Sequence, residues 1–86
     1  MPEISRFFGI IIAMFHADHA PPHFHVRYSE HKALIAIETL TVLRGSLSPR
    51  VLGMVVEWGF LHREELLENW RLGRREAALK KIPPLE

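Results

Sequence analysis

The chain of 86 residues contains no cysteine, which excludes disulfide bonds and zinc sites built from thiolates. It also lacks a long hydrophobic run. The apolar stretch at residues 9–15 is far shorter than the roughly 20 residues that a membrane-spanning helix needs. No basic segment with a following cleavage site marks a secretion signal. We therefore expect a cytoplasmic protein without a membrane anchor.

A strong excess of charge of one sign is absent as well. The formal net charge is +1, so the composition alone does not indicate a nucleic-acid-binding protein. Hydrophobic residues make up 48% of the chain, which excludes a disordered polypeptide. A chain of this length builds one hydrophobic core, and we expect a single domain over residues 1–86.

The first half, residues 1–44, contains short apolar runs separated by turn residues, a pattern typical of β-strands. Gly9 separates the first two runs, and Glu30-His31 is the expected turn between two later ones. The Pro21-Pro22 pair is a stiff connection, because proline cannot donate the hydrogen bonds of a sheet. We predict a small antiparallel sheet of three to five strands, drawn from residues 4–8, 10–15, 23–29, 32–38 and 39–44.

The second half has helical periodicity. Ser48 is the expected N-cap and Pro49 the first helical residue of a helix over residues 48–75. Gly59 interrupts the pattern, so the helix is either kinked there or divided into two. Residues 79–86 form an extended tail, which is either docked on the sheet or loose. One helical face carries Val51, Val55, Trp58, His62, Leu66, Trp70 and Gly73 at spacings of three or four.

These elements predict an α+β fold, in which a long or kinked C-terminal helix packs on one face of the sheet. Successive side chains of a strand point to opposite faces. Phe24, Val26 and Tyr28 therefore share a face, which we expect to be buried against the helix. The opposite face, exposed or only partly covered, carries His23, His25 and Arg27.

Five of the six histidines lie within residues 16–31. Histidine exchanges protons near neutral pH, and cleavage of RNA by its own 2′-hydroxyl needs a base, an acid and a cation. His23 and His25 fit the first two roles, and Arg27 fits the third as the group that holds the phosphate. Asp18 or His19 would orient one imidazole. The candidate catalytic residues for RNA cleavage without a cofactor are therefore His23, His25, Arg27, Asp18 and His19.

The same histidines are candidate metal ligands, since histidine is the commonest metal ligand in proteins. Zinc and nickel sites use three or four protein ligands of this kind. An arginine on the same face, Arg27, argues against a dication nearby. The candidate ligands are His16, His19, His23 and His25, with Asp18 as an additional carboxylate.

A third interpretation assigns the histidine cluster no chemistry. The histidines would then be solvated side chains beside a rigid turn, and Arg27 would pair with Glu30 or Glu38 on a neighbouring strand.

The apolar helix face is interpreted structurally. His62 is expected to be a partly buried, hydrogen-bonded histidine. Trp58 and Trp70 are expected in the core or in a homodimer contact, because tryptophans at helical spacing more often pack than bind bases.

Three segments carry a resemblance to a known family: Pro2-Glu3-Ile4-Ser5-Arg6-Phe7-Phe8-Gly9-Ile10, Asp18-His19-x-x-Pro22-His23-Phe24-His25-Val26, and Trp58-x-x-x-His62-x-x-Glu65-Leu66-x-x-Asn69-Trp70. They closely resemble the bacterial family known as domain of unknown function 4160. Its members are small proteins, often encoded beside another small protein as in toxin–antitoxin pairs. The resemblance therefore implies a protein partner, and an activity only by analogy. The family's characteristic positions correspond to Asp18, His19, Pro22, His23, His25, His62, Asn69 and Trp70.

The residues and the resemblance together favour one component of a toxin–antitoxin-like pair that cleaves or binds RNA. One alternative is a protein-binding module without enzymatic activity, such as an antitoxin, adaptor or regulator, that docks a partner through a sheet edge or a helix face. The other alternative is a protein that binds a divalent metal, zinc or nickel.

Overall fold

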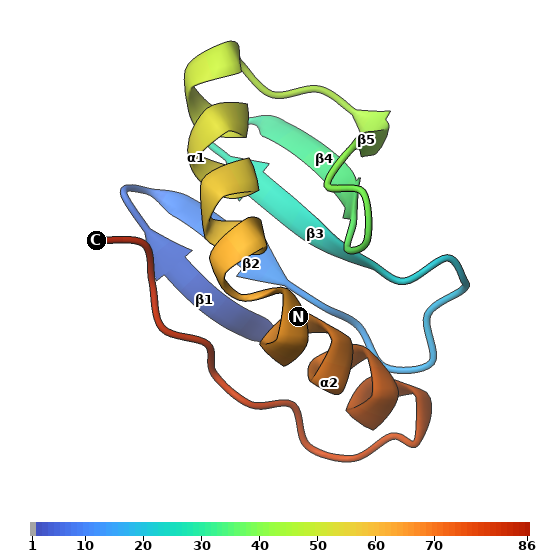
Figure 1. Cartoon of the computed structure of the whole chain (residues 1–86). Coiled ribbons are helices and arrows are strands. Elements are labelled where there is room, and N and C mark those ends of the chain that lie inside the picture. Colours follow the sequence, from blue (N-terminus) through green and yellow to red (C-terminus); the bar gives the residue numbers. More distant parts are fainter. Residues whose placement is uncertain (1) are drawn as a thin grey trace.

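The computed structural model describes residues 2–86 of the chain. Five strands are followed by two helices, and the predicted α+β fold is confirmed (Figure 1). The elements are β1 (Glu3–Phe7), β2 (Ile10–Ala13), β3 (His23–Tyr28), β4 (His31–Ala36), β5 (Val42–Gly45), α1 (Pro49–Leu61) and α2 (Arg63–Arg74).

The strands form one antiparallel sheet in the order β1-β2-β3-β4-β5. Gly9 lies at the tip of the first hairpin with a φ of 79°, a conformation that suits glycine and matches the twist of the flanking strands. Across the middle of the sheet, His25 is paired with Ala13 of β2 and with Leu34 of β4. Their side chains therefore belong to the same face of the sheet.

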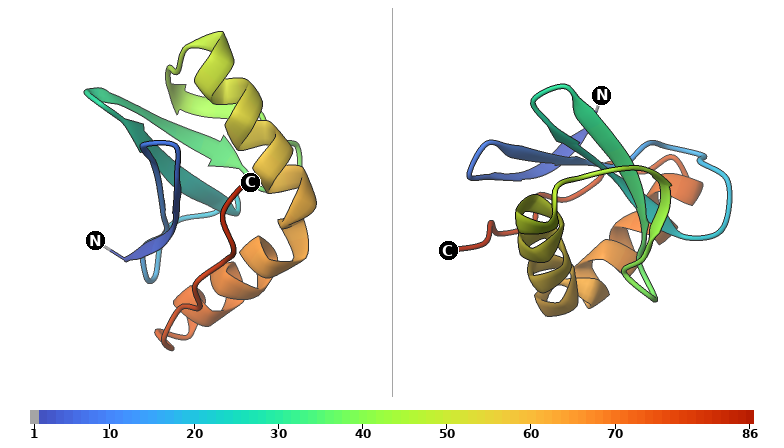
Figure 2. Two further views of the ribbon diagram at one scale, coloured as in Figure 1. Left: turned by 90° about the vertical axis from the view of Figure 1, so that its left-hand side faces the viewer. Right: turned by 90° about the horizontal axis from the view of Figure 1, so that it is seen from above.

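The helices cover one face of the sheet, as the side view in Figure 2 shows. Phe24 and Val26 are buried on this face. Trp58 of α1 is fully buried against Phe24, with the two ring centroids 5.9 Å apart. Tyr28 packs at the margin of the same core. The expectation that this side of β3 packs against the helix is confirmed.

Two turns differ from the sequence-based expectation. The chain reverses between β3 and β4 at Ser29, which has a φ of 56°, and His31 is the first residue of β4 rather than part of the turn. The last strand starts later than expected, because Leu40 turns the chain with a φ of 57° before β5 begins.

The helical half is divided into two helices, and the division lies at His62 rather than at Gly59. Ser48 is the N-cap of α1, and its hydroxyl accepts a hydrogen bond from the amide of Val51. His62 has a φ of −119° and leaves the helical path, while its Nδ1 is hydrogen-bonded to the carboxylate of Glu65 in α2. Neither helix in the described part of the chain is long and apolar enough to cross a bilayer.

The C-terminal tail is docked rather than loose, and it runs beside β1 (Figure 1). Ile82 is buried, and its amide donates a hydrogen bond to the carbonyl of Ile4. The indole N–H of Trp58 donates to the carbonyl of Pro83 at 2.9 Å. The tail thereby closes the open side of the core between β1 and α1.

Asn69 of α2 attaches the tail through its side chain. This buried amide donates to the carbonyl oxygen of Lys80 at 2.8 Å and accepts from the Lys80 amide at 2.9 Å. Both hydrogen-bonding ends of the Asn69 side chain are therefore satisfied by one residue of the tail.

We expect Asn69→Ala to lower the free energy of unfolding by about 2 kcal/mol, because a buried amide with two backbone partners is lost. Amide hydrogens of residues 79–83 should also exchange faster. Urea denaturation and hydrogen exchange measure the two effects. Glu68→Ala is the matched control, since it removes only an exposed ion pair with the same tail residue and should cost less than about 0.5 kcal/mol. Equal losses in the two variants would contradict this role of Asn69.

Candidate functional site

The loop between β2 and β3 carries Asp18 and is held at both ends. The amide of Ala17 donates to the carbonyl of Gly73 at the end of α2, at 3.0 Å. On the other side, the amide of Ile37 donates to the carbonyl of Pro22 and aligns the loop with the end of β4. These contacts fix the position of Asp18 relative to β3.

Three side chains converge at the start of β3, and we call them the Asp18 cluster: Asp18, His23 and His25. The Oδ2 of Asp18 lies 3.1 Å from the Nε2 of His23 and 3.1 Å from the Nε2 of His25. One ligand atom from each residue lies within 4.8 Å of the other two. The two-residue spacing on a strand places both imidazoles on one face, and the loop brings the carboxylate to them.

The members of the cluster differ in exposure. His23 has 8% of its side chain exposed, because Trp70 of α2 packs over it with the ring centroids 5.3 Å apart. His25 keeps 28% exposed, and the ring of Phe15 packs against it edge-on at 4.4 Å. The histidine face is thus partly covered, one of the two outcomes expected from the sequence. Solvent reaches the cluster from the side of His25.

The hydrogen bonds of His23 restrict its protons. Its Nδ1 lies 2.7 Å from the carbonyl oxygen of Pro21, which only accepts, so Nδ1 must carry a proton and donate it. Its Nε2 faces the Asp18 carboxylate, which also only accepts when ionised. A neutral His23 would therefore turn a lone pair toward a carboxylate oxygen. Either a second proton or a cation has to lie between these two atoms.

Asp18 is held in its ionised form. Partial burial by itself would raise the pKa of the carboxyl group. The hydrogen bonds from His25 and from the amide of His19, together with the positive charge that His23 and His25 carry when protonated, outweigh burial and lower the pKa. The cluster therefore offers a carboxylate at neutral pH.

The Asp18 cluster can hold a metal ion. Ligand atoms about 2.1 Å from one metal, at angles of about 90–110°, lie roughly 3.0–3.4 Å apart, and both nitrogen–oxygen distances here agree with that separation. The hydrogen bond from His23 to a backbone carbonyl is the outer contact that orients most metal-binding histidines. Two imidazoles and one carboxylate form a donor set that suits divalent transition metals.

Two of the candidate metal ligands lie outside the cluster. The Nε2 of His16 donates to the carbonyl of Ala77 at 2.9 Å, so this side chain fastens the loop to the segment after α2. His19 is exposed, and only its backbone amide contacts the Asp18 carboxylate. Neither imidazole belongs to the Asp18 cluster, whose third member is the carboxylate of Asp18.

Arg27 follows His25 on the same face of β3 and is exposed. Within residues 2–86 it forms no ion pair, so the pairing with Glu30 or Glu38 considered from the sequence does not occur. Lys32 of β4 lies directly opposite Arg27 in the sheet. The arginine is therefore free to contact a bound molecule.

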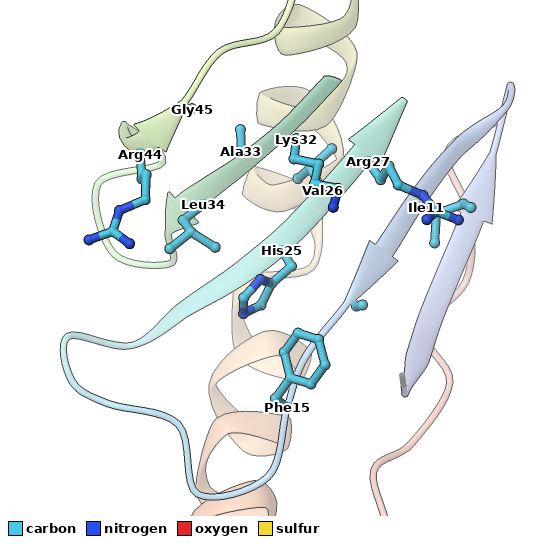
Figure 3. Close-up of a pocket in the computed structure, with 11 residues that line it drawn as sticks. Ile11, Phe15, His25, Val26, Arg27, Lys32, Ala33, Leu34, Arg44 and Gly45 are labelled. Carbon is cyan, nitrogen blue, oxygen red and sulfur yellow. The ribbon is translucent and has the colours of Figure 1, made fainter. Parts of the chain in front are cut away.

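A pocket of about 410 Å³ opens on this face beside His25 (Figure 3). The helices lie behind the sheet in this view, so the pocket belongs to the uncovered face. Leu34 and Lys32 of β4 and Arg44 of β5 join His25 and Arg27 in lining it. Sequence reasoning missed these β4 and β5 residues. The alternation in residues 32–36 is the signal that could have assigned Lys32 and Leu34 to one face.

Comparison with known proteins gives one match. A family model described as Domain of unknown function (DUF4160) matches residues 9–71, a segment that contains the whole Asp18 cluster and Trp70. No curated protein and no solved structure matches the chain. The family description carries no activity, so the proposals below rest on the site itself.

The different burial of the two histidines leads to different effects on stability. With metal chelated, His23→Ala should lower the free energy of unfolding by about 1–3 kcal/mol, because it removes a buried ring that packs against Trp70. His25→Ala should lower it by less than about 1 kcal/mol, since that ring is partly solvated. Urea denaturation of both variants in EDTA measures this. A larger loss for His25→Ala would contradict the assigned packing.

Proposed function

The chain belongs to the DUF4160 family, and we propose that it is a metal-dependent protein in which Asp18, His23 and His25 hold one divalent transition-metal ion. The observation that carries this proposal is the contact of two imidazole nitrogens with one carboxylate oxygen, at equal distances of 3.1 Å. A metal ion between the Nε2 of His23 and the Asp18 carboxylate would take the place of a second proton on His23, and the ring would then remain neutral.

Three protein ligands leave coordination positions for water and substrate, as in metal sites that catalyse hydrolysis. Structural zinc sites, by contrast, are closed by four protein ligands. His25 borders the pocket of the uncovered face, which gives a substrate access to the open side of the centre. The proposed function is therefore hydrolytic rather than structural.

We propose zinc or nickel as the ion, because nitrogen and oxygen donors without thiolate suit both metals. The same donor set of two histidines and one carboxylate also occurs in non-haem iron(II) sites. The metal content of the isolated protein distinguishes these ions.

The untagged protein should contain or take up about one equivalent of metal per chain, measured by mass spectrometry of the metal content and by calorimetric titration with zinc and nickel. Asp18→Asn and His25→Ala should each weaken binding by about 100-fold or more, because each removes a ligand without removing a buried ring.

The control is the double variant His19→Ala, His31→Ala, which removes two exposed histidines of the same segment and should bind metal like the wild type. Equal weakening by the control would show that binding depends on histidine content rather than on the cluster. Unchanged binding in Asp18→Asn would contradict the proposed ligand set.

RNA cleavage without a metal is the second candidate, and the His25–Asp18 hydrogen bond favours it. In that reaction the 2′-hydroxyl oxygen bonds to phosphorus, the P–O5′ bond breaks, a base takes the hydroxyl proton and an acid gives one to the leaving oxygen. The Nδ1 of His25 has no hydrogen-bond partner within residues 2–86, so this nitrogen could serve as one of these groups. Both ring nitrogens of His23 are already hydrogen-bonded, so the exchange of protons between two free histidines is less well supported.

A cleavage assay separates the two candidates. A labelled RNA should be cut by the metal-loaded protein, should survive in EDTA, and should be cut again when zinc or nickel is restored. Cleavage that persists in EDTA and disappears in His25→Ala would favour the metal-independent reaction. An RNA that stays intact under all conditions would contradict both the metal-dependent and the metal-independent cleavage. Metal binding itself would then still be decided by the titration.

The proposal keeps two further elements predicted from the sequence and the family resemblance. They are a cytoplasmic location and a cognate small protein as partner, as in toxin–antitoxin pairs. The exposed side chains of Phe60 and Leu61 on α1 support a partner-binding role for the helix face. A module that only binds its partner would form the complex with both histidines of the cluster replaced.

A further inference from the structure

We infer that the uncovered face of the sheet binds the phosphodiester backbone of a single-stranded nucleic acid. We call this surface the cationic face and define it by Arg27, Lys32 and Arg44, with His25, Leu34 and Phe15 beside them. This inference names the substrate class of the proposed metal centre. It rests on the proposed function only for the cleavage of the nucleic acid, because binding to the cationic face does not require the metal.

The charges of this face are unbalanced. Strands β2 to β5 contain no acidic residue. Arg27, Lys32 and Arg44 are exposed, and none of them forms an ion pair or a side-chain hydrogen bond within the described chain. By contrast, Arg6 at the edge of the sheet is paired with Glu3 at 2.8 Å. The three free cations therefore lie on neighbouring strands, from β3 in the middle of the sheet to the edge strand β5.

Two of these cations face each other. Arg27 and Lys32 are directly opposite in the β3–β4 ladder, an arrangement of like charges that destabilises a sheet. Arg44 is paired with Leu34, one strand further along. Neighbouring strands are about 4.8 Å apart, so the cations of β3 and β5 are separated by roughly 10 Å across the sheet. A chain of phosphates that crosses the strands would relieve this repulsion at several points.

The surface between the cations is apolar. Ile11, Ala13 and Leu34 line the pocket, and Phe15 lies at the end where His25 is exposed (Figure 3). A cationic groove with apolar and aromatic contacts is the combination that single-stranded nucleic acids bind, with bases on the apolar part and phosphates on the cations. An acidic peptide would use the cations but would leave the apolar strip uncovered. This difference favours the nucleic acid.

The proposed metal centre lies at one end of the cationic face. His25 belongs both to the Asp18 cluster and to the pocket, so a strand that lies along the cationic face would reach the metal centre at the Phe15 end. Arg27 is separated from His25 by one residue on β3 and would hold the phosphate next to that end.

The test is fluorescence anisotropy with a short labelled oligouridine at low salt. The triple variant Arg27→Ala, Lys32→Ala, Arg44→Ala should weaken binding by about tenfold or more and make the dependence of log K on log salt less steep by about 2. The matched control Arg50→Ala, Arg74→Ala, Arg75→Ala loses the same charge from exposed positions outside this face and should weaken binding by less than about threefold.

Binding is measured with metal-free protein in EDTA, so that the proposed metal centre takes no part in it. If the metal titration fails, binding of the oligomer to the cationic face can still be measured. If the oligomer does not bind, the proposed metal centre is still tested by the titration. A matching deoxyoligonucleotide shows whether the surface prefers RNA or accepts both. Equal weakening by the two triple variants would overturn the inference. So would binding of polyglutamate in preference to both oligonucleotides, which would indicate an acidic protein as ligand.

Discussion

The packing of Trp58 against Phe24 is the contact on which the arrangement of the molecule depends. The chain has enough helix to cover one face of a five-stranded sheet, and Trp58 fixes which face that is. The C-terminal tail completes the same core by accepting a hydrogen bond from the Trp58 indole. The other face of the sheet is consequently left without a layer, and its central residues remain accessible.

The reactive side chains on the uncovered face come from a loop as well as from the sheet. Strand alternation aligns His23 and His25, but the carboxylate that joins them comes from the connection between β2 and β3. Because α2 runs past the end of the sheet, Trp70 shields one imidazole and leaves the other at the rim of the pocket. The cluster thus combines one buried imidazole with one accessible imidazole, an arrangement that suits the proposed metal centre because that centre would be open on one side.

Much of the fold was predictable because it depends on local patterns. Alternating residues defined β3 and its buried face, and Ser48-Pro49 marked the start of α1. The sequence placed the interruption of the helix at Gly59, which is earlier than the observed division at His62. Glycine weakens a helix locally, whereas the hydrogen bond from His62 to Glu65 depends on the structure around it. The composition of the Asp18 cluster was predicted in part. Proximity in sequence suggested His16 and His19, but the folded loop turns both away from the cluster.

The hydrogen bond between Ala17 and Gly73 has a consequence for the order of assembly. The three cluster residues are close together in the sequence, yet the loop that carries Asp18 is held by the far end of α2. During synthesis, all three residues of the cluster would leave the ribosome long before the residue that positions one of them. The Asp18 cluster therefore becomes complete only after the last helix has docked, so a nascent or truncated chain that lacks this helix carries the three residues without bringing them together.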